Sequence, residues 1–153
     1  LDNFAVDKFL KKENPYFIIH AAGIVGGIHK NLREPIKFLT ENVQMGKNLI
    51  MSAYKNNIRR IINLSSSCIY PPKAKNPLKE NQIMNGKFEK SNEAYAYSKV
   101  FNHLLCNYII TTNKQFQYKT LVPCNLFGEY DNFDSDSSHL IASIILKINK
   151  AIR

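Results

Sequence analysis

The chain has 153 residues, of which 44% are hydrophobic, and its 21 lysines and arginines against 12 acidic residues give a formal net charge of +9. This length can bury the core of one ordinary domain, and the apolar fraction is near the globular norm. No apolar run is long enough to span a membrane and no signal-peptide pattern occurs, which predicts a cytoplasmic protein with no membrane partner. The chain starts with Leu1 rather than methionine, so we expect it to be part of a longer protein.

The positive charge does not form a nucleic-acid-binding pattern. The lysines are scattered among asparagines and isoleucines, and no more than two basic residues are adjacent. Aromatic residues do not interleave with them as in RNA-binding motifs. We therefore expect no nucleic-acid partner, and the charge remains compatible with an anionic small molecule such as a nucleotide sugar.

Patterns typical of helices and strands alternate along the first half of the chain. Asp2 or Asn3 can cap a helix that must end before Pro15. An apolar run over residues 16–22 then predicts a strand, and several glycines follow it. Helical spacing of apolar residues predicts an amphipathic helix over about residues 36–56.

The second half continues the alternation. Residues 58–64 are apolar on both faces and predict a buried strand. After a loop rich in Pro, Lys and Asn over residues 71–92, a helix is predicted over about residues 93–110 and a short strand over residues 119–122. A last helix starts near Ser138, and we expect it to bury Leu140, Ile141, Ile144, Ile145 and Ile148.

This order of elements predicts an α/β fold, a parallel sheet with helices on both faces. Three short segments each follow a predicted strand: AAGIVGG at residues 21–27, SSSC at residues 65–68 and PCNLFG at residues 123–128. Ligands of open parallel sheets bind outside the carboxyl ends of the strands. We therefore expect the three segments to meet at one edge of the sheet and to form a site there.

Tyr95 and Lys99 stand four residues apart on the helix predicted over residues 93–110. Such a pair is often only a solvated lysine stem packed on a ring. Its position one crossover after a strand that ends in three serines favours a proton-transfer site instead, whereas Tyr97 points to a different face of the helix. We expect the Lys99 ammonium to lower the pKa of the Tyr95 phenol, and the Ser66 hydroxyl to hold a substrate oxygen.

The three cysteines, Cys68, Cys106 and Cys124, are odd in number and lack CxxC spacing. This pattern predicts reduced thiols, with neither a disulfide framework nor a metal site. A lone cysteine at a strand end is most often a small buried hydrophobe. Cys68 stands out because the segment SSSCIYPP at residues 65–72 contains neither Asp nor Glu.

Ser66, Tyr95 and Lys99 resemble the site of the extended short-chain dehydrogenase/reductase family. SSSCIYPP, the NPLKEN and SNEAYAYSK segments after it, and PCNLFGEYDNFDSDSSHL at residues 123–140 are similar to the GDP-L-fucose synthase branch of that family. The related 4,6-dehydratases carry an acidic pair near the position of Cys68, and the simple 4-epimerases lack the cysteine. The resemblance implies NADPH-dependent 3,5-epimerisation and 4-reduction of a GDP-4-keto-6-deoxy sugar, which yields GDP-L-fucose.

The resemblance also implies a role for each residue of the site. Cys68 would be the base and His139 the acid of the epimerisation, since a thiol and an imidazole exchange protons near neutral pH. If the resemblance is set aside, His139 is interpreted as a histidine at the start of a helix and in contact with solvent. Tyr95 would supply the proton when NADPH reduces the ketone, and Ser66 and Lys99 would stabilise the developing oxyanion.

Two groups of binding residues follow from the same resemblance. Those that match the family's cofactor segments are Ala21, Ala22, Gly23, Leu64, Ser65, Ser66, Ser67, Tyr95, Lys99, Pro123, Cys124, Asn125, Leu126 and His139. Those implied to bind the substrate are Ser66, Asn125 and Lys147. Lys147 stands where the family has an arginine, so a point charge replaces a two-pronged donor.

The resemblance further implies that residues 1–153 are the central part of a Rossmann-like NAD(P)-binding domain. No GxxGxxG or GxGxxG segment precedes a strand. We therefore expect the first βαβ unit, which holds the pyrophosphate, and most of the C-terminal substrate domain to lie outside the chain. A homodimer and an inactive isolated fragment are also expected. Two alternatives stay open: an enzyme of another GDP-keto-sugar, of colitose or heptose type, and a non-catalytic nucleotide-binding domain.

Overall fold

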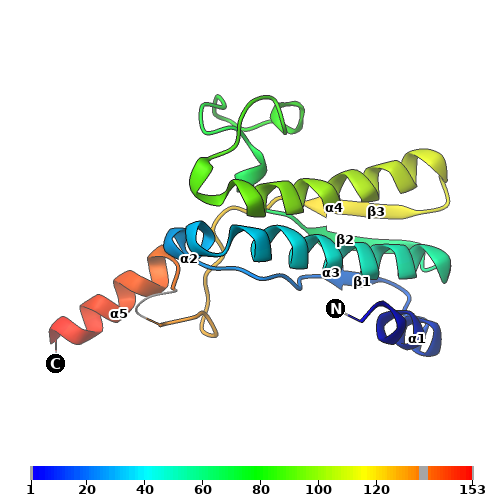
Figure 1. Cartoon of the computed structure of the whole chain (residues 1–153), viewed down its shortest axis with the longest axis horizontal. Coiled ribbons are helices and arrows are strands. Elements are labelled where there is room, and N and C mark those ends of the chain that lie inside the picture. The colour runs from blue at the N-terminus through cyan, green and yellow to red at the C-terminus, as the bar shows by residue number, and fades with distance from the viewer. Residues whose placement is uncertain (1, 135–137, 153) are drawn as a thin grey trace.

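The computed structural model describes residues 2–134 and 138–152. Helices and strands alternate as the sequence pattern predicts (Figure 1). The elements are α1 (Asn3–Glu13), β1 (Ile18–His20), α2 (Ile28–Arg33), α3 (Pro35–Lys55), β2 (Arg60–Leu64), α4 (Glu93–Thr112), β3 (Gln117–Leu121) and α5 (Leu140–Ile152), with one-turn 3-10 helices η1 (Ser67–Ile69), η2 (Glu80–Gln82) and η3 (Lys90–Asn92). None of these described helices is both long and apolar enough to cross a membrane.

Local chemistry explains where several of these elements begin. The Asp2 carboxylate caps α1 by accepting from the amides of Phe4 and Ala5 at 2.8 and 3.2 Å. Pro35 occupies the first turn of α3, where its missing N–H has no partner to lose. The short helix α2, which begins after Gly27, was not predicted, because six residues are too few to show a clear hydrophobic period.

The three strands form a parallel sheet in the order β1-β2-β3, which confirms the predicted Rossmann-like α/β architecture. Ile18 lies opposite Ile61, and Ile61 lies opposite Tyr118. Strands β1 and β2 are shorter than the apolar runs that predict them, whereas β3 begins two residues before its predicted start and ends one residue before its predicted end. The sheet therefore has three carboxyl ends facing the same way, as the proposed site requires.

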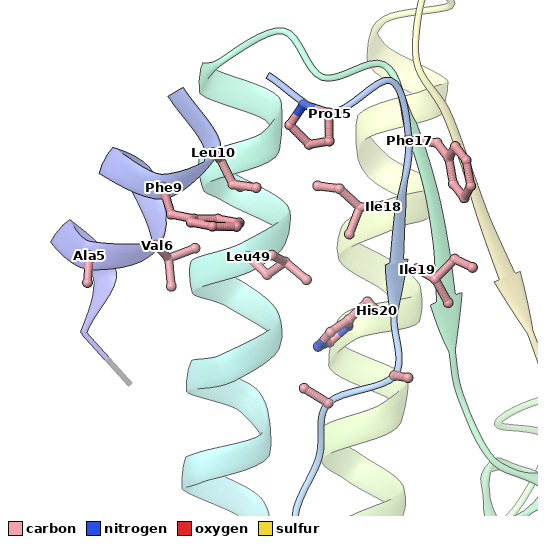
Figure 2. A pocket seen from close by; sticks show the side chains of 12 residues that line it. Ala5, Val6, Phe9, Leu10, Pro15, Phe17, Ile18, Ile19, His20 and Leu49 are labelled. Carbon is pink, nitrogen blue, oxygen red and sulfur yellow. The ribbon is translucent and has the colours of Figure 1, made fainter. Parts of the chain in front are cut away.

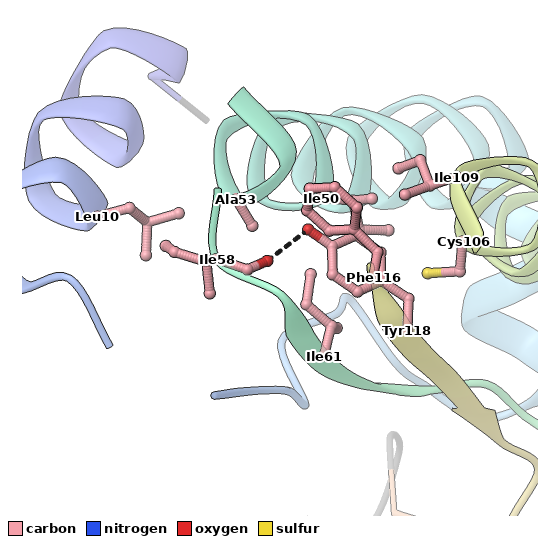
Figure 3. Close-up of a cluster of buried hydrophobic side chains, with 9 residues drawn as sticks. All are labelled: Leu10, Ile50, Ala53, Ile58, Ile61, Cys106, Ile109, Phe116 and Tyr118. Atoms are coloured by element: carbon pink, nitrogen blue, oxygen red, sulfur yellow. Dashed lines mark hydrogen bonds between the residues drawn. The ribbon is translucent and has the colours of Figure 1, made fainter. Parts of the chain in front are cut away.

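The main core lies between one face of the sheet and the helices α3 and α4 (Figure 3). The Tyr118 hydroxyl donates to the carbonyl of Ile58 at 2.8 Å, so the largest buried side chain keeps its polar end satisfied. Helix α1 adds Leu10 at the margin of the same cluster. Its buried members are Leu10, Ile50, Ala53, Ile58, Ile61, Cys106, Ile109, Phe116 and Tyr118.

The opposite face of the sheet is open among the described residues. Ile19 is 57% exposed and Leu121 is 51% exposed, although both lie within strands. The second helical layer that the alternation predicts does not cover this face in the described part of the chain. The covered face alone positions the site, because α3 and α4 both pack there.

The prediction that α5 buries one apolar face is wrong for this chain. Only Ala142 of this helix is buried, because α5 projects away from the sheet and its covering helices (Figure 1). The apolar residues of the helix contact solvent instead. Those expected in the core and found exposed are Leu140, Ile141, Ile144, Ile145 and Ile148.

Candidate active site

The ends of β2 and β3 are tied together where the serine run begins. The amide of Ser65 donates to the carbonyl of Leu121 at 2.8 Å. Ser66 then caps η1, and its hydroxyl accepts from the amide of Cys68 at 3.4 Å. Ile69, the last residue of η1, is buried in a second small core. This turn holds Ser66 and Cys68 at the carboxyl edge of the sheet.

Tyr95 and Lys99 lie one turn apart on the first half of α4, which packs above that edge. Lys99 is only 6% exposed, and its ammonium donates to the carbonyl of Leu64 at 3.0 Å. The same nitrogen lies 5.5 Å from the centre of the Tyr95 ring. Burial lowers the pKa of Lys99, and the nearby thiol of Cys68, when ionised, opposes that effect. The lysine thus ties α4 to the end of β2.

The hydroxyl of Ser66 influences both acidic side chains of the site, the Cys68 thiol and the Tyr95 phenol. Hydrogen bonding to Ser66 lowers the pKa of both the Cys68 thiol and the Tyr95 phenol. Burial raises the pKa of the Cys68 thiol, while the bond from Ser66 and the charge of Lys99 act in the opposite direction. Ser66, Cys68, Tyr95 and Lys99 therefore form one contiguous group, the Ser66 cluster.

The expectation that Lys99 lowers the pKa of Tyr95 is wrong in this structure. Burial raises the pKa of Tyr95 above its ordinary value, a charge on Cys68 raises it further, and the bond from Ser66 only partly offsets them. The Lys99 ammonium is bound to the Leu64 carbonyl and lies 5.5 Å from the centre of the Tyr95 ring. Tyr95 is thus held as a neutral phenol, which is the proton-donating form.

The glycine-rich loop after β1 borders the Ser66 cluster. Asn42 of α3 fixes this loop by accepting from the Ile24 amide at 2.7 Å and donating to the Ile24 carbonyl at 3.1 Å. A methyl group on Gly23 would lie 3.3 Å from the Asn42 amide oxygen and 3.5 Å from the Lys99 nitrogen. Bare backbone thus lies beside Lys99, where a side chain would fill the space.

Comparison with known proteins identifies the family. The model of the NAD dependent epimerase/dehydratase family matches residues 1–152. The chain belongs to the NAD-dependent epimerase/dehydratase family. Within this family, GDP-L-colitose synthase from Yersinia pseudotuberculosis is 51% identical over 99% of this chain and 49% of its own length. GDP-L-fucose synthase from Azorhizobium caulinodans is 47% identical over 96% of this chain and 47% of its own length.

Solved structures of similar proteins agree with the family assignment. A GDP-L-fucose synthetase from Naegleria fowleri bound to NADP superposes with a TM-score of 0.87 at 30% identity, covering 98% of this chain and 49% of that chain. A GDP-D-glycero-L-gluco-heptose synthase from Campylobacter jejuni gives a TM-score of 0.90 at 28% identity, over 98% of this chain and 44% of that chain. The predicted resemblance to the GDP-L-fucose synthase branch is confirmed. The chain spans about half the length of the curated relatives it matches.

Other residues that the family resemblance singles out lie away from the Ser66 cluster or outside its contacts. His139 precedes α5 with an exposed side chain, and no hydrogen bond or charge interaction joins it to the cluster within the described chain. Asn125 and Lys147 are also exposed, the first in the loop after β3 and the second on α5. Tyr97 packs edge-on against Phe88 with ring centres 5.0 Å apart, as expected for a tyrosine on a different helix face.

The segments expected to contact the cofactor border the cluster to different degrees. Ser65 is buried and Leu64, Ser67 and Gly23 are half-buried, whereas Ala21 and Ala22 are exposed at the end of β1. In the loop after β3, Pro123 is half-buried, and the exposed residues are Cys124, Asn125 and Leu126. The cofactor contacts of these residues stay a prediction.

A residue that sequence reasoning missed, His20, lies beside the cluster. It ends β1 and is 3% exposed, and its ring lies on the α3 side of the strand together with Ile18 (Figure 2). Its signal in the sequence was a single polar side chain at the end of an apolar strand. The ring also borders an apolar cavity of about 640 Å³ between α1, α3 and β1. That cavity contains none of the four members of the Ser66 cluster.

Proposed function

We propose that the complete protein containing this chain catalyses the NADPH-dependent 3,5-epimerisation and 4-reduction of a GDP-4-keto-6-deoxy sugar to GDP-L-fucose. The observation that carries the proposal is the Ser66 cluster, in which Ser66 caps the turn that holds Cys68 and the neutral phenol of Tyr95 lies beside the buried ammonium of Lys99. Relatives named for this reaction, 47% identical in Azorhizobium caulinodans, support it. Because the chain covers about half of such relatives, the activity is proposed for the complete protein.

The edge of the sheet is suited to a dinucleotide. The backbone at Gly23 lies beside Lys99 with no side chain above it, and a Cβ there would contact the Lys99 nitrogen at 3.5 Å. Residues that would hold NADPH are Ala21, Ala22 and Gly23 after β1, Leu64 to Ser67 after β2, and Pro123 to Leu126 after β3. When bound, NADPH supplies the hydride that reduces the ketone.

In the reduction, the chain supplies the proton and steadies the developing charge. Tyr95, neutral because burial raises its pKa, donates its proton to the former ketone oxygen. Ser66, already bonded to Tyr95, donates a hydrogen bond to the same oxygen. The Lys99 ammonium, fixed on the Leu64 carbonyl, supplies positive charge that stabilises the developing oxyanion.

In the epimerisation, the ketone makes the hydrogens on both flanking carbons acidic. Cys68, as a thiolate, takes a proton from one face of the sugar, and the Ser66 hydroxyl and the Lys99 charge both favour that thiolate. His139 returns a proton to the opposite face and so inverts the carbon. Its exposed side chain at the start of α5 is accessible to a substrate.

Isotope exchange tests the role of Cys68 in the complete protein. In Cys68→Ser, we expect deuterium entry from D₂O into the sugar to fall by on the order of 100-fold, since a general base is lost. Reduction of an already epimerised ketone should persist. Cys106→Ala, which removes a thiol buried in the main core, is the matched control and should keep exchange. Undiminished exchange in Cys68→Ser would rule out Cys68 as the base.

A colitose-type reaction is the second candidate, and the 51% identity to a GDP-L-colitose synthase favours it. Colitose carries no hydroxyl at carbon 3, so such an enzyme inverts carbon 5 alone. Parallel turnover of GDP-4-keto-6-deoxymannose and its 3-deoxy analogue, with the products resolved by NMR, separates the two. Preference for a GDP-keto-heptose would point instead to the heptose type, and failure to oxidise NADPH with all three sugars would favour a non-catalytic domain.

We also propose that the complete protein forms a homodimer. The resemblance implies a homodimer, with the contact formed by two long helices, and α3 and α4 are the long helices that this chain offers. Analytical ultracentrifugation of the complete protein gives the oligomeric state directly. A purely monomeric species at assay concentrations would contradict this proposal.

A further inference from the structure

His20 is a buried titratable group to which the proposed reaction assigns no role. It lies at the carboxyl end of β1, on the face of the strand that the helices cover (Figure 2). Only 3% of the residue is exposed. A polar ring in this position must find hydrogen-bond partners inside the protein or leave them unmade at a cost.

The hydrogen bonds of the neighbouring strands fix which ring nitrogen carries the proton. Nδ1 of His20 lies 3.0 Å from the amide oxygen of Asn63, while the amide nitrogen of Asn63 donates to the Thr120 hydroxyl at 3.4 Å. An amide oxygen only accepts, so Nδ1 is the protonated nitrogen. Nε2 is then a bare acceptor, and it is buried without a partner in the described chain.

A buried donor with spare hydrogens, the Lys99 ammonium, is close enough for its charge to act on the His20 ring. His20 pairs with Asn63 across the sheet, and the following residue, Leu64, accepts the Lys99 ammonium. That bond uses one of the three hydrogens on the ammonium. Burial and the charge of Lys99 lower the pKa of His20, with the bond to Asn63 opposing them, so the ring is neutral at physiological pH.

We propose that His20 is a positioning residue for Lys99: its neutral ring accepts, through one water molecule, a hydrogen bond from the ammonium. The catalytic consequence rests on the proposed function, whereas the hydrogen bond does not. The titratable groups that face Lys99 are Tyr95 on its own helix, Cys68 on η1 and His20 on β1. Of these, His20 has a buried ring nitrogen without a hydrogen-bond partner in the described chain, and this acceptor keeps the buried amine charged and fixed in position.

Two variants of His20 separate the proposed bond from simple packing. Asparagine can still donate to Asn63 but has no atom at the position of Nε2, whereas glutamine reaches that position with an acceptor. In the complete protein with ¹³C-labelled lysine, the Cε signal of Lys99 reports the pKa of its amine. We expect His20→Asn to lower this pKa by about one unit, the equivalent of one hydrogen bond to a charged group, and His20→Gln to restore it.

Turnover provides a second measurement. The alkaline limb of the kcat profile should move to lower pH in His20→Asn and return in His20→Gln. His103→Asn is the matched control, because His103 is a half-buried histidine of α4 whose charge partner is Glu80. It should change neither the Lys99 signal nor the kcat profile. An unchanged Lys99 pKa in His20→Asn, or an equal shift in both His20 variants, would overturn the proposal.

A measurement without any substitution guards against a variant that fails to fold. In ¹⁵N-histidine protein, His20 should show the neutral form with the proton on Nδ1, and the other tautomer would contradict the proposal. Both NMR measurements are independent of turnover. An enzyme with no activity but a Lys99 pKa that depends on His20 would disprove the proposed function and leave this inference standing.

Discussion

Three titratable side chains, Cys68, Tyr95 and Lys99, belong to the Ser66 cluster, and burial is the largest influence on the pKa of each. It raises the pKa of the thiol and the phenol and lowers that of the amine. Desolvation thus favours the neutral form of every member. The charges that catalysis requires are supported by the Ser66 hydroxyl and by the Leu64 carbonyl that holds the amine.

Removal of the phenol tests Tyr95 as the proton donor. In the complete protein, Tyr95→Phe should lower the rate of ketone reduction by about 10²- to 10⁴-fold, the usual contribution of a general acid. Because burial raises the pKa of Tyr95, the wild-type phenol stays protonated above pH 10 and should donate up to that pH. A pH profile of single-turnover reduction measures this. A decline centred well below pH 10 that is absent in Tyr95→Phe would contradict it.

The buried histidines predict how stability changes with pH. Burial lowers the pKa of both His20 and His103 from 6.5, while the bond to Asn63 and the charge of Glu80 respectively oppose it. Below pH 6.5 the unfolded chain therefore binds protons that the folded chain does not. The free energy of unfolding of the complete protein should fall as pH falls below 6.5, by at most about 1.4 kcal/mol per pKa unit of lowering.

Urea denaturation at a series of pH values measures this dependence. His103→Gln should flatten the slope below pH 6.5, because the ring that resists protonation is gone. His29→Gln, which changes an exposed histidine of α2, is the matched control and should leave the slope unaltered. Equal slopes in all three proteins would show that burial of His103 does not contribute.

At the scale of elements, the close approach of α3 and α4 depends on one glycine. Gly46 of α3 is buried against the amide of Asn102 on α4, and a Cβ on Gly46 would overlap that amide. Both residues lie inside the helix pair, so neither can move to the surface. The contact sets how near α4, with Tyr95 and Lys99, comes to α3 and the loop that Asn42 holds.

Substitution of this glycine should therefore be costly. Gly46→Ala is expected to destabilise the complete protein by about 1–3 kcal/mol through overpacking, measured by thermal or urea unfolding. The double variant Gly46→Ala with Asn102→Ala should recover part of that loss, because the shorter side chain makes room. Gly128→Ala is the control, since a Cβ there meets nothing within 4 Å. A loss in Gly128→Ala equal to that in Gly46→Ala would reject the packing explanation.

The elements differ in how well sequence patterns predict them. α1, α3 and α4 were predicted within about two residues of their observed ends, because caps, prolines and long hydrophobic periods mark them. The Ser66 cluster was predicted from the serines at a strand end, from the four-residue spacing of Tyr95 and Lys99 on a helix and, for Cys68, from the family resemblance. The link from Lys99 to the Leu64 carbonyl and the role of His20 were not, since both depend on pairings between distant segments. The helical spacing of hydrophobic residues correctly predicted an apolar face on α5, but spacing within one helix does not show which part of the protein covers that face.

At the scale of the whole molecule, the described chain carries a site on one face of a sheet whose other face is open. Ile19 and Leu121 on this open face and the apolar side chains of α5 are exposed in the described chain. The segments expected to hold the cofactor come from all three strand ends, but the sequence has no GxxGxxG segment before a strand. Binding of the pyrophosphate thus lacks its usual backbone donors.

The isolated chain of 153 residues should therefore bind NADPH far more weakly than the complete protein. Isothermal titration calorimetry of both, side by side, measures the difference. Circular dichroism of the isolated chain confirms that its helices are formed before the titration. Equal affinity of the folded isolated chain and the complete protein would show that the loops after β1, β2 and β3 suffice for binding.

The Ser66 hydroxyl has one hydrogen atom, and hydrogen bonding to Ser66 lowers the pKa of both Cys68 and Tyr95, so the hydroxyl can donate to only one of them at a time. A hydrogen given to the sulfur of Cys68 is withheld from the oxygen of Tyr95. Beyond the effect of burial, a thiolate on Cys68 also opposes ionisation of Tyr95. Once the thiol has lost its proton, the Ser66 hydroxyl donates its hydrogen to the sulfur, and the phenol retains its own proton. Proton removal by Cys68 and proton donation by Tyr95 would then occur in turn through the one Ser66 hydroxyl, and the two steps would not compete.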